Sequence, residues 1–401
     1  MPSTRRFLVL AGAALALALA GLPAQAADIP APGEIVMSPN IEHVTNVPKP
    51  EALADINTDM AFQGDYAYVG NYHGFSIYDI RNPKRARVVS SVVCPGGQMD
   101  VSVYGDLLFG SVDSSRSDDS CGSTGQSASV KESWEGVRIF DIRDKRNPRY
   151  IKSVETSCGS HTHTLVPDRR GKNVYLYVSS YSPNAAFPDC RPPHDLISII
   201  KVPLRNPRAA SVIATPNLFP DGGFPGVPGP FPDGKSATTG CHDITAYPEK
   251  GIAAGACGPT RGANAYYDIV RDRMVFRGYF KIPRHQSDTE NCVAHNGSLI
   301  PVKGKDIMVQ AWYQGGISVV DFTDPGDVQE IAYFERGPDT TPLFGGHWSA
   351  YYYNGHIYGS DFHQGLDVLK LNDRRTNQAN GVKFDILNAQ TQQSYPDRRH
   401  H

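Results

Sequence analysis

Hydrophobic and polar positions alternate along most of this chain in short runs, a pattern typical of β-strands rather than helices. From about residue 57, an order recurs: an apolar strand, a turn, a second strand ending in small residues, a glycine, a third strand ending in aspartate, an Asn-Pro turn and a fourth strand. The third strand is clearest at 74–80, 136–142 and 316–322, with weaker copies at 196–202 and 365–371. The chain is therefore expected to be all-β and built from repeats.

Four strands per repeat predict a β-propeller, because one such unit cannot cover its hydrophobic faces without neighbours. We count six units, with seven as the alternative, and the six begin near Asn57, Gln98, His161, His242, His295 and His347. The last unit lacks a fourth strand. Residues 40–48 resemble the fourth strands at 87–93 and 329–334, so we expect this N-terminal strand to complete the last unit and close the ring.

The repeats also set the expected domain boundaries. Residues 1–26 form a signal peptide and residues 27–373 a single propeller domain. Two stretches interrupt the repeat and are expected to be loop insertions, the polar stretch 113–131 and the Pro/Gly-rich stretch 216–240. Residues 374–401 have no unit to join and are expected to form a flexible tail.

The repeated third strand and the turn after it resemble the LVIVD-repeat family of bacterial and archaeal surface proteins. The resemblance covers most of residues 57–371. It implies four-stranded propeller blades, in agreement with the pattern of the residues themselves. It implies almost nothing about activity, because no biochemical role is established for that family.

The N-terminus predicts export. Arg5 and Arg6 precede an apolar run, and the run ends at the small-residue site Ala24-Gln25-Ala26. The paired arginines fit the twin-arginine route as well as an ordinary signal. No second apolar span or lipid-carrying cysteine follows, so we expect a secreted monomer without a transmembrane anchor. The formal net charge of −2 provides no basic surface for nucleic acid.

Seven cysteines in an exported chain predict disulfides with one thiol left over. Within the repeat frame, Cys94 pairs with Cys121, Cys158 with Cys190 and Cys241 with Cys257, each pair inside one unit. Cys292 remains, and it is either an inert buried thiol, a metal ligand or a member of a different pairing.

The candidate chemistry lies in a column of histidines. Aligning the first strands places His161, His242, His295 and His347 at one position of four successive units, where a propeller brings side chains towards its axis. His363, in a loop expected on the same side, is the fifth candidate ligand. Neutral imidazoles in an all-nitrogen set favour copper or iron, with zinc as a further possibility. In this respect alone, the column is similar to the axial histidines of carotenoid cleavage oxygenases.

Two classes of function remain open. One is a metalloprotein, with oxidase or oxygenase chemistry as an option. The other is a non-catalytic propeller that binds a small molecule or an extracellular protein. The chain contains no His-Glu-x-x-His, Gly-x-Ser-x-Gly, phosphate-binding or dinucleotide-binding motif, so the common hydrolase and nucleotide readings lack support. The sequence does not decide whether the protein is an enzyme.

Overall fold

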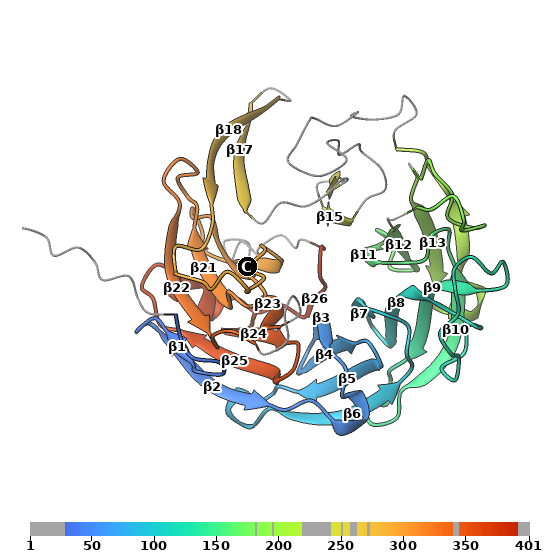
Figure 1. The fold of residues 1–401 in the computed structure, drawn as a ribbon, viewed down its shortest axis with the longest axis horizontal. Helices are drawn as coiled ribbons and strands as arrows, with labels where there is room; N and C mark the ends of the chain where they lie inside the picture. The colour runs from blue at the N-terminus through green and yellow to red at the C-terminus, as the bar shows by residue number, and fades with distance from the viewer. Residues whose placement is uncertain are drawn as a thin grey trace, which may run out of the picture.

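The computed structural model describes residues 29–180, 183–194, 196–218, 242–249, 252–256, 263–270, 273–339 and 345–391. It is all-β, and its sheets are arranged around a common centre with the first strand of each group nearest that centre (Figure 1). Helical structure among the described residues is limited to four short 3-10 turns: η1 (Glu51–Leu53), η2 (Pro83–Arg85), η3 (Pro207–Ala209) and η4 (Asn377–Gly381). None of the described helices is long and apolar enough to span a membrane.

The first three groups of strands form separate sheets. The first sheet contains β3 (Asn57–Gln63), β4 (Tyr66–Asn71), β5 (Gly74–Asp79) and β6 (Arg87–Val93), with β26 (Ile386–Leu387) added beside β3. The second contains β7 (Val101–Tyr104), β8 (Leu107–Arg116), β9 (Trp134–Asp141) and β10 (Arg149–Glu155). The third contains β11 (Thr162–Pro167), β12 (Asn173–Ser179), β13 (Ser198–Pro203) and β14 (Ser211–Ala214).

The fourth group is split into two hairpins, β15 (Asp243–Tyr247) with β16 (Ile252–Ala256), and β17 (Asn264–Val270) with β18 (Arg273–Phe280). The last two groups join in a nine-stranded sheet through a short parallel contact between β19 and β23. Its strands are β1 (Val36–Met37), β22 (Gln329–Glu335), β21 (Ile317–Asp321), β20 (Ile307–Ala311), β19 (Asn296–Ile300), β23 (His347–Tyr353), β24 (His356–Asp361), β25 (Gly365–Leu371) and β2 (Ile41–Val47).

The predicted all-β repeat is confirmed at the level of strands. Each of the six predicted units begins with a strand that starts at, or within three residues of, the expected position. The five predicted third strands overlap β5, β9, β13, β21 and β25. The N-terminal strand also pairs as expected, because β2 runs antiparallel to β25 with Ile41 opposite Leu371.

A glycine near the start of the third strand recurs because the fourth strand passes too close for a side chain. A Cβ at Gly74 would collide with the carbonyl oxygen of Val92 on β6. At Gly365 the colliding oxygen belongs to Val47 on β2, and both glycines have a positive φ, 143° and 102°. The N-terminal strand therefore makes the same close approach as an ordinary fourth strand.

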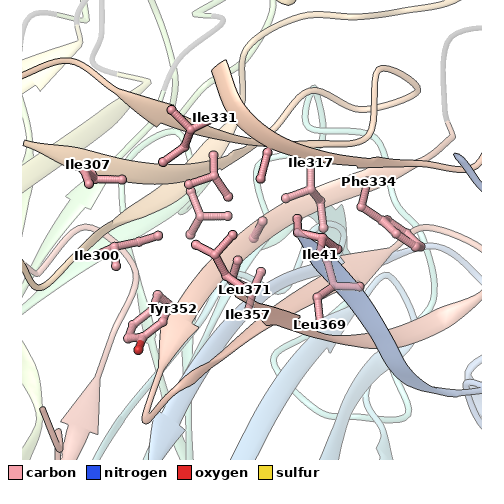
Figure 2. Close-up of a cluster of buried hydrophobic side chains, with 14 of the residues drawn as sticks. Ile41, Ile300, Ile307, Ile317, Ile331, Phe334, Tyr352, Ile357, Leu369 and Leu371 are labelled. Atoms are coloured by element: carbon pink, nitrogen blue, oxygen red, sulfur yellow. The ribbon is translucent and has the colours of Figure 1, made fainter. Parts of the chain in front are cut away.

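The hydrophobic core lies between neighbouring groups of strands. In the cluster of Figure 2, Ile317 and Phe334 come from β21 and β22, whereas Ile357 and Leu369 come from β24 and β25. Ile41 joins this cluster from β2. Strands that are apolar on both faces are expected when each sheet is covered on both sides. The N-terminal strand therefore contributes to the core as well as to the hydrogen-bond ladder.

The prediction of a flexible tail over 374–401 is wrong for residues 374–391. These residues include η4 and β26, and β26 pairs with the end of β3 through Leu387 opposite Phe62. Phe384 and Ala389 are buried. The segment is ordered because its backbone pairs with first strands such as β3. The repeat pattern predicts partners only at the fourth-strand position, so it does not reveal this pairing. Residues 392–401 lie outside the described residues.

Two of the three predicted disulfides are present, Cys94 with Cys121 and Cys158 with Cys190. They close loops with sequence separations of 27 and 32 residues, which corresponds to about 3 kcal/mol each in the chain-entropy model. Disulfides of this kind indicate an oxidising compartment. Cys241 and Cys257 lie outside the described residues, as do residues 219–240 of the second loop insertion, so that third pairing stays a prediction.

The first loop insertion, expected over 113–131, begins later than predicted. Strand β8 continues to Arg116, and Cys121 then ties the loop to Cys94. Asp113 is consequently a strand residue facing the centre of the molecule rather than a loop residue, with consequences for the candidate site.

Candidate functional site

Three of the five predicted histidines line one cavity at the common centre of the sheets. His161, His242 and His295 each stand one residue before a first strand, β11, β15 and β19 respectively. We call the space that they line the central cavity, and its wall consists of Thr58, Asp59, Gln98, Asp100, His161, Thr162, His242, Asp243, His295, Asn296 and Trp348. Residues more than 200 positions apart in the sequence therefore meet here.

His161 and His242 face each other across the cavity. Their Nε2 atoms lie 3.2 Å apart, and each ring is held from behind by a carboxylate on Nδ1. Asp113 bonds His161 at 2.9 Å, and Asp243 bonds His242. A carboxylate on Nδ1 holds a proton there, which is the usual arrangement behind metal-bound histidines. The two Nε2 atoms form a hydrogen bond, so one of the two rings carries a further proton. Burial acts against the charge of His242, but the hydrogen bond and charge of Asp243 outweigh it and raise the pKa of His242.

His295 is held in the same tautomer by a backbone group. Its Nδ1 lies 2.5 Å from the carbonyl oxygen of Trp348, and a carbonyl can only accept, so Nδ1 carries the proton. The rings of Tyr313 and Trp348 pack against the imidazole with centroids 4.5 and 4.9 Å away. Burial lowers the pKa of His295 to about 4, so this ring is neutral and able to act as a ligand at physiological pH.

Three aspartates form the other half of the cavity wall. Burial raises the pKa of Asp59, and burial together with the charge of Asp59 raises that of Asp100 well above its ordinary value. Asp59 accepts from Tyr351 and Asn296, whereas Oδ1 of Asp100 is buried without a hydrogen-bond partner among the described residues. Burial acts against the charge of Asp243, but the hydrogen bond and charge of His242 outweigh it and lower the pKa of Asp243.

The central cavity is small. It has space for roughly one water molecule, which suits an ion or a bound water rather than an organic substrate enclosed on all sides. Its wall combines imidazole nitrogens with buried carboxylates, and no Lys or Arg is among the lining residues. A buried acidic wall without a basic side chain favours a cation.

The expectation that His347 joins this group is wrong. In the parallel contact between β19 and β23, Asn296 lies opposite Ser349, so His295 corresponds to Trp348 and not to His347. The pairing of β23 with β24 shifts between His347 and Ser349, which marks a β-bulge. A one-residue shift turns a side chain to the other face of a strand, and here it directs the imidazole away from the cavity.

His347 instead belongs to a buried ion-pair network around Asp367, which we call the Asp367 network. Nε2 of His347 lies 3.0 Å from Asp367, and His43, Asn46 and Arg336 also donate to that carboxylate. Among the described residues, His347, Asp361 and Asp367 are the set with three donor atoms within 4.8 Å of one another. Arg336 already supplies the positive charge there, 3.7 Å from Asp361, so this set does not require a metal.

His363 does not reach the central cavity either. Its Nε2 lies 3.8 Å from Asp339, and its backbone N–H donates to Asp361. Cys292, the remaining thiol, donates to Gln286 and packs with Trp312 and Phe280. Burial raises the pKa of the Cys292 thiol to about 12, so the thiol stays protonated, as the inert interpretation expects.

The repeat alignment places Asp59 and Asp100 beside the histidine column, at the position of His163 in the third unit, but the predicted site residues include neither them nor Asp243. Asp59 and Asp100 stand at the third position of their units, two residues after Asn57 and Gln98, and Asp243 stands at the second position, directly after His242. An aspartate one or two residues after the column position, in three of the six units, is visible in the sequence and could have been assigned to the site. Asp113 could not, because the interruption of the repeat predicts a loop from Asp113 onward.

Comparison with known proteins finds similarity to solved structures but not to a family model or a curated protein. A Bacteroides thetaiotaomicron protein of unknown function is 10% identical with a TM-score of 0.40, over 84% of this chain and 76% of that chain. Saccharomyces cerevisiae Sqt1 is 7% identical with a TM-score of 0.39, over 78% and 82%. The Malassezia sympodialis allergen Mala s 1 is 14% identical with a TM-score of 0.38, over 83% and 96%. Similarities of this size support no conclusion about function.

Proposed function

We propose that this chain is an exported six-bladed β-propeller, closed into a ring by β2, that binds one transition-metal ion through His161, His242 and His295. The blade count is supported by the six groups of strands, and the labelled first strands β3, β7, β11, β15 and β23 lie towards a common centre (Figure 1). The pairing of β2 with β25 supports the closure. Membership of the LVIVD-repeat family stays a prediction, as do secretion and the twin-arginine route.

The observation that carries the metal proposal is the facing pair of imidazoles. The 3.2 Å contact between the two Nε2 atoms requires a positive centre: either a proton shared in a hydrogen bond between the rings or a metal ion in the place of that proton. This separation is close to the edge of a tetrahedral site, roughly 3.3 Å for metal–nitrogen bonds of about 2.05 Å. The carboxylates on both Nδ1 atoms give the orientation and basicity expected of metal ligands.

His295 and Asp100 complete the candidate ligand set. Both line the cavity, His295 with a neutral ring and Asp100 with a buried oxygen that has no partner among the described residues. They stand further away than the facing pair, because no three of these donor atoms lie within 4.8 Å of one another. Binding would therefore draw them inward. Three nitrogens and one carboxylate oxygen suit copper, iron or zinc.

A bound metal would supply a Lewis acid or a redox centre, while the chain holds the ligands in one tautomer and surrounds them with an acidic wall. Oxidase or oxygenase chemistry stays a prediction, and a cavity with space for one water gives it no added support. The alternative is a propeller that binds a partner without a metal.

The test is the metal content and metal affinity of the exported protein. His400 and His401 are replaced by Ala in every sample, because that adjacent pair would bind metal on its own. We expect about one equivalent of Cu, Fe or Zn, and a loss of affinity for added Zn²⁺ or Cu²⁺ of at least about 100-fold in His161→Ala, His242→Ala and His295→Ala. His347→Ala is the matched control, with affinity unchanged.

Two results would overturn the proposal. One is less than roughly a tenth of an equivalent of any transition metal together with micromolar or weaker affinity for the added ions. The other is equal loss of binding in His242→Ala and His347→Ala, because that would assign the effect to the fold. Either result would favour the metal-free binding propeller.

A further inference from the structure

The ordered C-terminal segment, residues 384–391, lies across the inner ends of the ring. It contacts the first strands of several successive units, always towards the end of the strand. Leu387 lies opposite Phe62 on β3, and Asn388 exchanges hydrogen bonds with the backbone of Val103 on β7. Thr391 donates to the carbonyl of Leu165 on β11. The histidines stand at the starts of these first strands, so the segment and the histidines occupy opposite ends of the centre.

Gln390 connects this segment to the candidate metal site. Its Nε2 donates to Oδ1 of Asp243, and its Oε1 accepts from Thr164 at 3.3 Å. The other carboxylate oxygen of Asp243 holds Nδ1 of His242. The backbone carbonyl of Gln390 also accepts from the N–H of Ala246, which fixes the segment on the strand that carries Asp243.

A continuous series of contacts therefore crosses the centre of the molecule. It runs from Gln390 to Asp243, to His242, across 3.2 Å to His161, and on to Asp113. The backbone N–H of Gln98 completes it with a hydrogen bond of 3.0 Å to Asp113. Each carboxylate in the series uses one oxygen for a histidine and the other for a neutral donor, which prevents the carboxylate from rotating away.

We propose that the C-terminal segment is part of the metal site: Gln390 positions Asp243, and through it His242, while residues 384–391 close the end of the centre away from the histidines. This inference rests on the proposed function for its metal, but the positioning of His242 applies to the metal-free protein as well. Gln390 is a positioning residue, since it touches Asp243 and not the ligand nitrogens. Its amide suits the role, because it donates to the carboxylate and accepts from a hydroxyl at once.

The experiment compares Gln390→Ala and Gln390→Glu with Asn388→Ala. Asn388 is a matched control, because it lies in the same segment and bonds β7 without touching Asp243. Metal affinity is measured by competition with a chelator for Zn²⁺, and the environment of the ligands by the visible spectrum of the Co²⁺ form. In the metal-free protein, the Nδ1–H resonances of ¹⁵N-labelled histidine report the hydrogen bond from His242 to Asp243. Thermal unfolding is recorded for each variant.

We expect Gln390→Ala to weaken Zn²⁺ affinity about 10- to 100-fold and to shift the His242 resonance, because loss of an outer-shell partner has effects of this size. Gln390→Glu places a second carboxylate beside Asp243 and should shift the resonance further. Asn388→Ala should leave affinity and resonance unchanged even if it lowers the unfolding temperature. An unchanged His242 resonance in both Gln390 variants would overturn the proposal.

Failure of the proposed function is distinguishable from failure of this inference. If the wild-type chain does not bind Zn²⁺ while Gln390→Ala still shifts the His242 resonance, then the metal site is wrong and the positioning role stands. If Zn²⁺ binds to wild type and to Gln390→Ala equally, then the C-terminal segment is a structural element only.

Discussion

Two buried groups of carboxylates and histidines, both assembled from distant units, differ in how their charge is compensated. In the Asp367 network, one carboxylate accepts from His43, Asn46, Arg336 and His347. In the central cavity, Asp100 is equally buried, yet its Oδ1 has no partner among the described residues and no basic side chain lines the wall. In the first group the charge of Asp367 is fully compensated, although Nδ1 of His347 is buried without a hydrogen-bond partner among the described residues.

The pKa of Asp367 and the pKa values of Asp59 and Asp100 shift in opposite directions. Burial alone would raise the pKa of Asp367, but the hydrogen bonds from His347 and His43 and the charge of Arg336 outweigh it and hold the pKa well below its usual range. Burial raises the pKa of Asp59 because the hydrogen bonds from Tyr351 and Asn296 oppose it only in part, and the charge of Asp59 adds to burial in raising the pKa of Asp100. Asp367 and Asp100 are equally buried, but positively charged and hydrogen-bonding partners compensate only the charge of Asp367. We infer that the central cavity, rather than the Asp367 network, has a place for a cation.

The largest change in stability is expected when the carboxylate of Asp367 is removed from the Asp367 network. Asp367→Asn should lower the free energy of unfolding by about 3–5 kcal/mol, because it leaves Arg336 buried without its main anionic partner. Asp100→Asn is the matched control, since it replaces a carboxyl that burial already disfavours as an anion, and we expect little loss of stability. Urea unfolding at pH 7 measures both. Equal destabilisation by the two substitutions would contradict the distinction between the groups.

A smaller effect concerns stability as a function of pH. Burial, followed by the charge of Asp113, raises the pKa of Glu135 to about 7 from 4.5. The folded state therefore holds a proton that the unfolded state releases, so this group lowers stability as the pH rises from about 4.5 to about 7. Glu135→Gln should be more stable than wild type by on the order of 2 kcal/mol at pH 8 and equal to it at pH 4. An advantage that persists at pH 4 would show that titration is not the cause.

The contribution of Asp367 to stability changes with pH in the opposite direction from that of Glu135. Its folded-state pKa lies below the unfolded value of about 3.9, so its contribution is fully present above that pH and is lost as the pH falls further. The acid side of the wild-type stability curve should flatten in Asp367→Asn and remain steep in Glu135→Gln. Unfolding free energies from pH 3 to pH 8 separate the two.

The smallest expected effect sharpens the assignment of the metal site. Asp100→Asn should weaken Zn²⁺ affinity by roughly 10-fold, because an amide is a poorer ligand than a carboxylate, while its stability stays near that of wild type. Isothermal titration with a competing chelator measures the affinity. Unchanged affinity would remove Asp100 from the ligand set and leave the three histidines.

The sequence by itself determined the all-β class, the start of each unit, the third strands, the pairing of the N-terminal strand and two disulfides. These features depend on local alternation, on glycine where two strands pass closely and on turn residues, all of which repeat at a readable spacing. The placement of His161, His242 and His295 on one cavity follows from the same repeat. The repeat also contains the aspartates that follow the histidine column.

Only the tertiary structure decided the rest. A single-residue bulge at Trp348 removed His347 from the central cavity, and a bulge leaves no signature in a sequence that still alternates normally. Asp113 and Gln390 reached His161 and Asp243 from outside the repeat, one from an extended strand and one from the C-terminal segment. The repeat fixes where each strand begins, but which carboxylate meets which imidazole depends on side-chain directions across strands distant in sequence, and those are settled only when the sheets pack around a common centre.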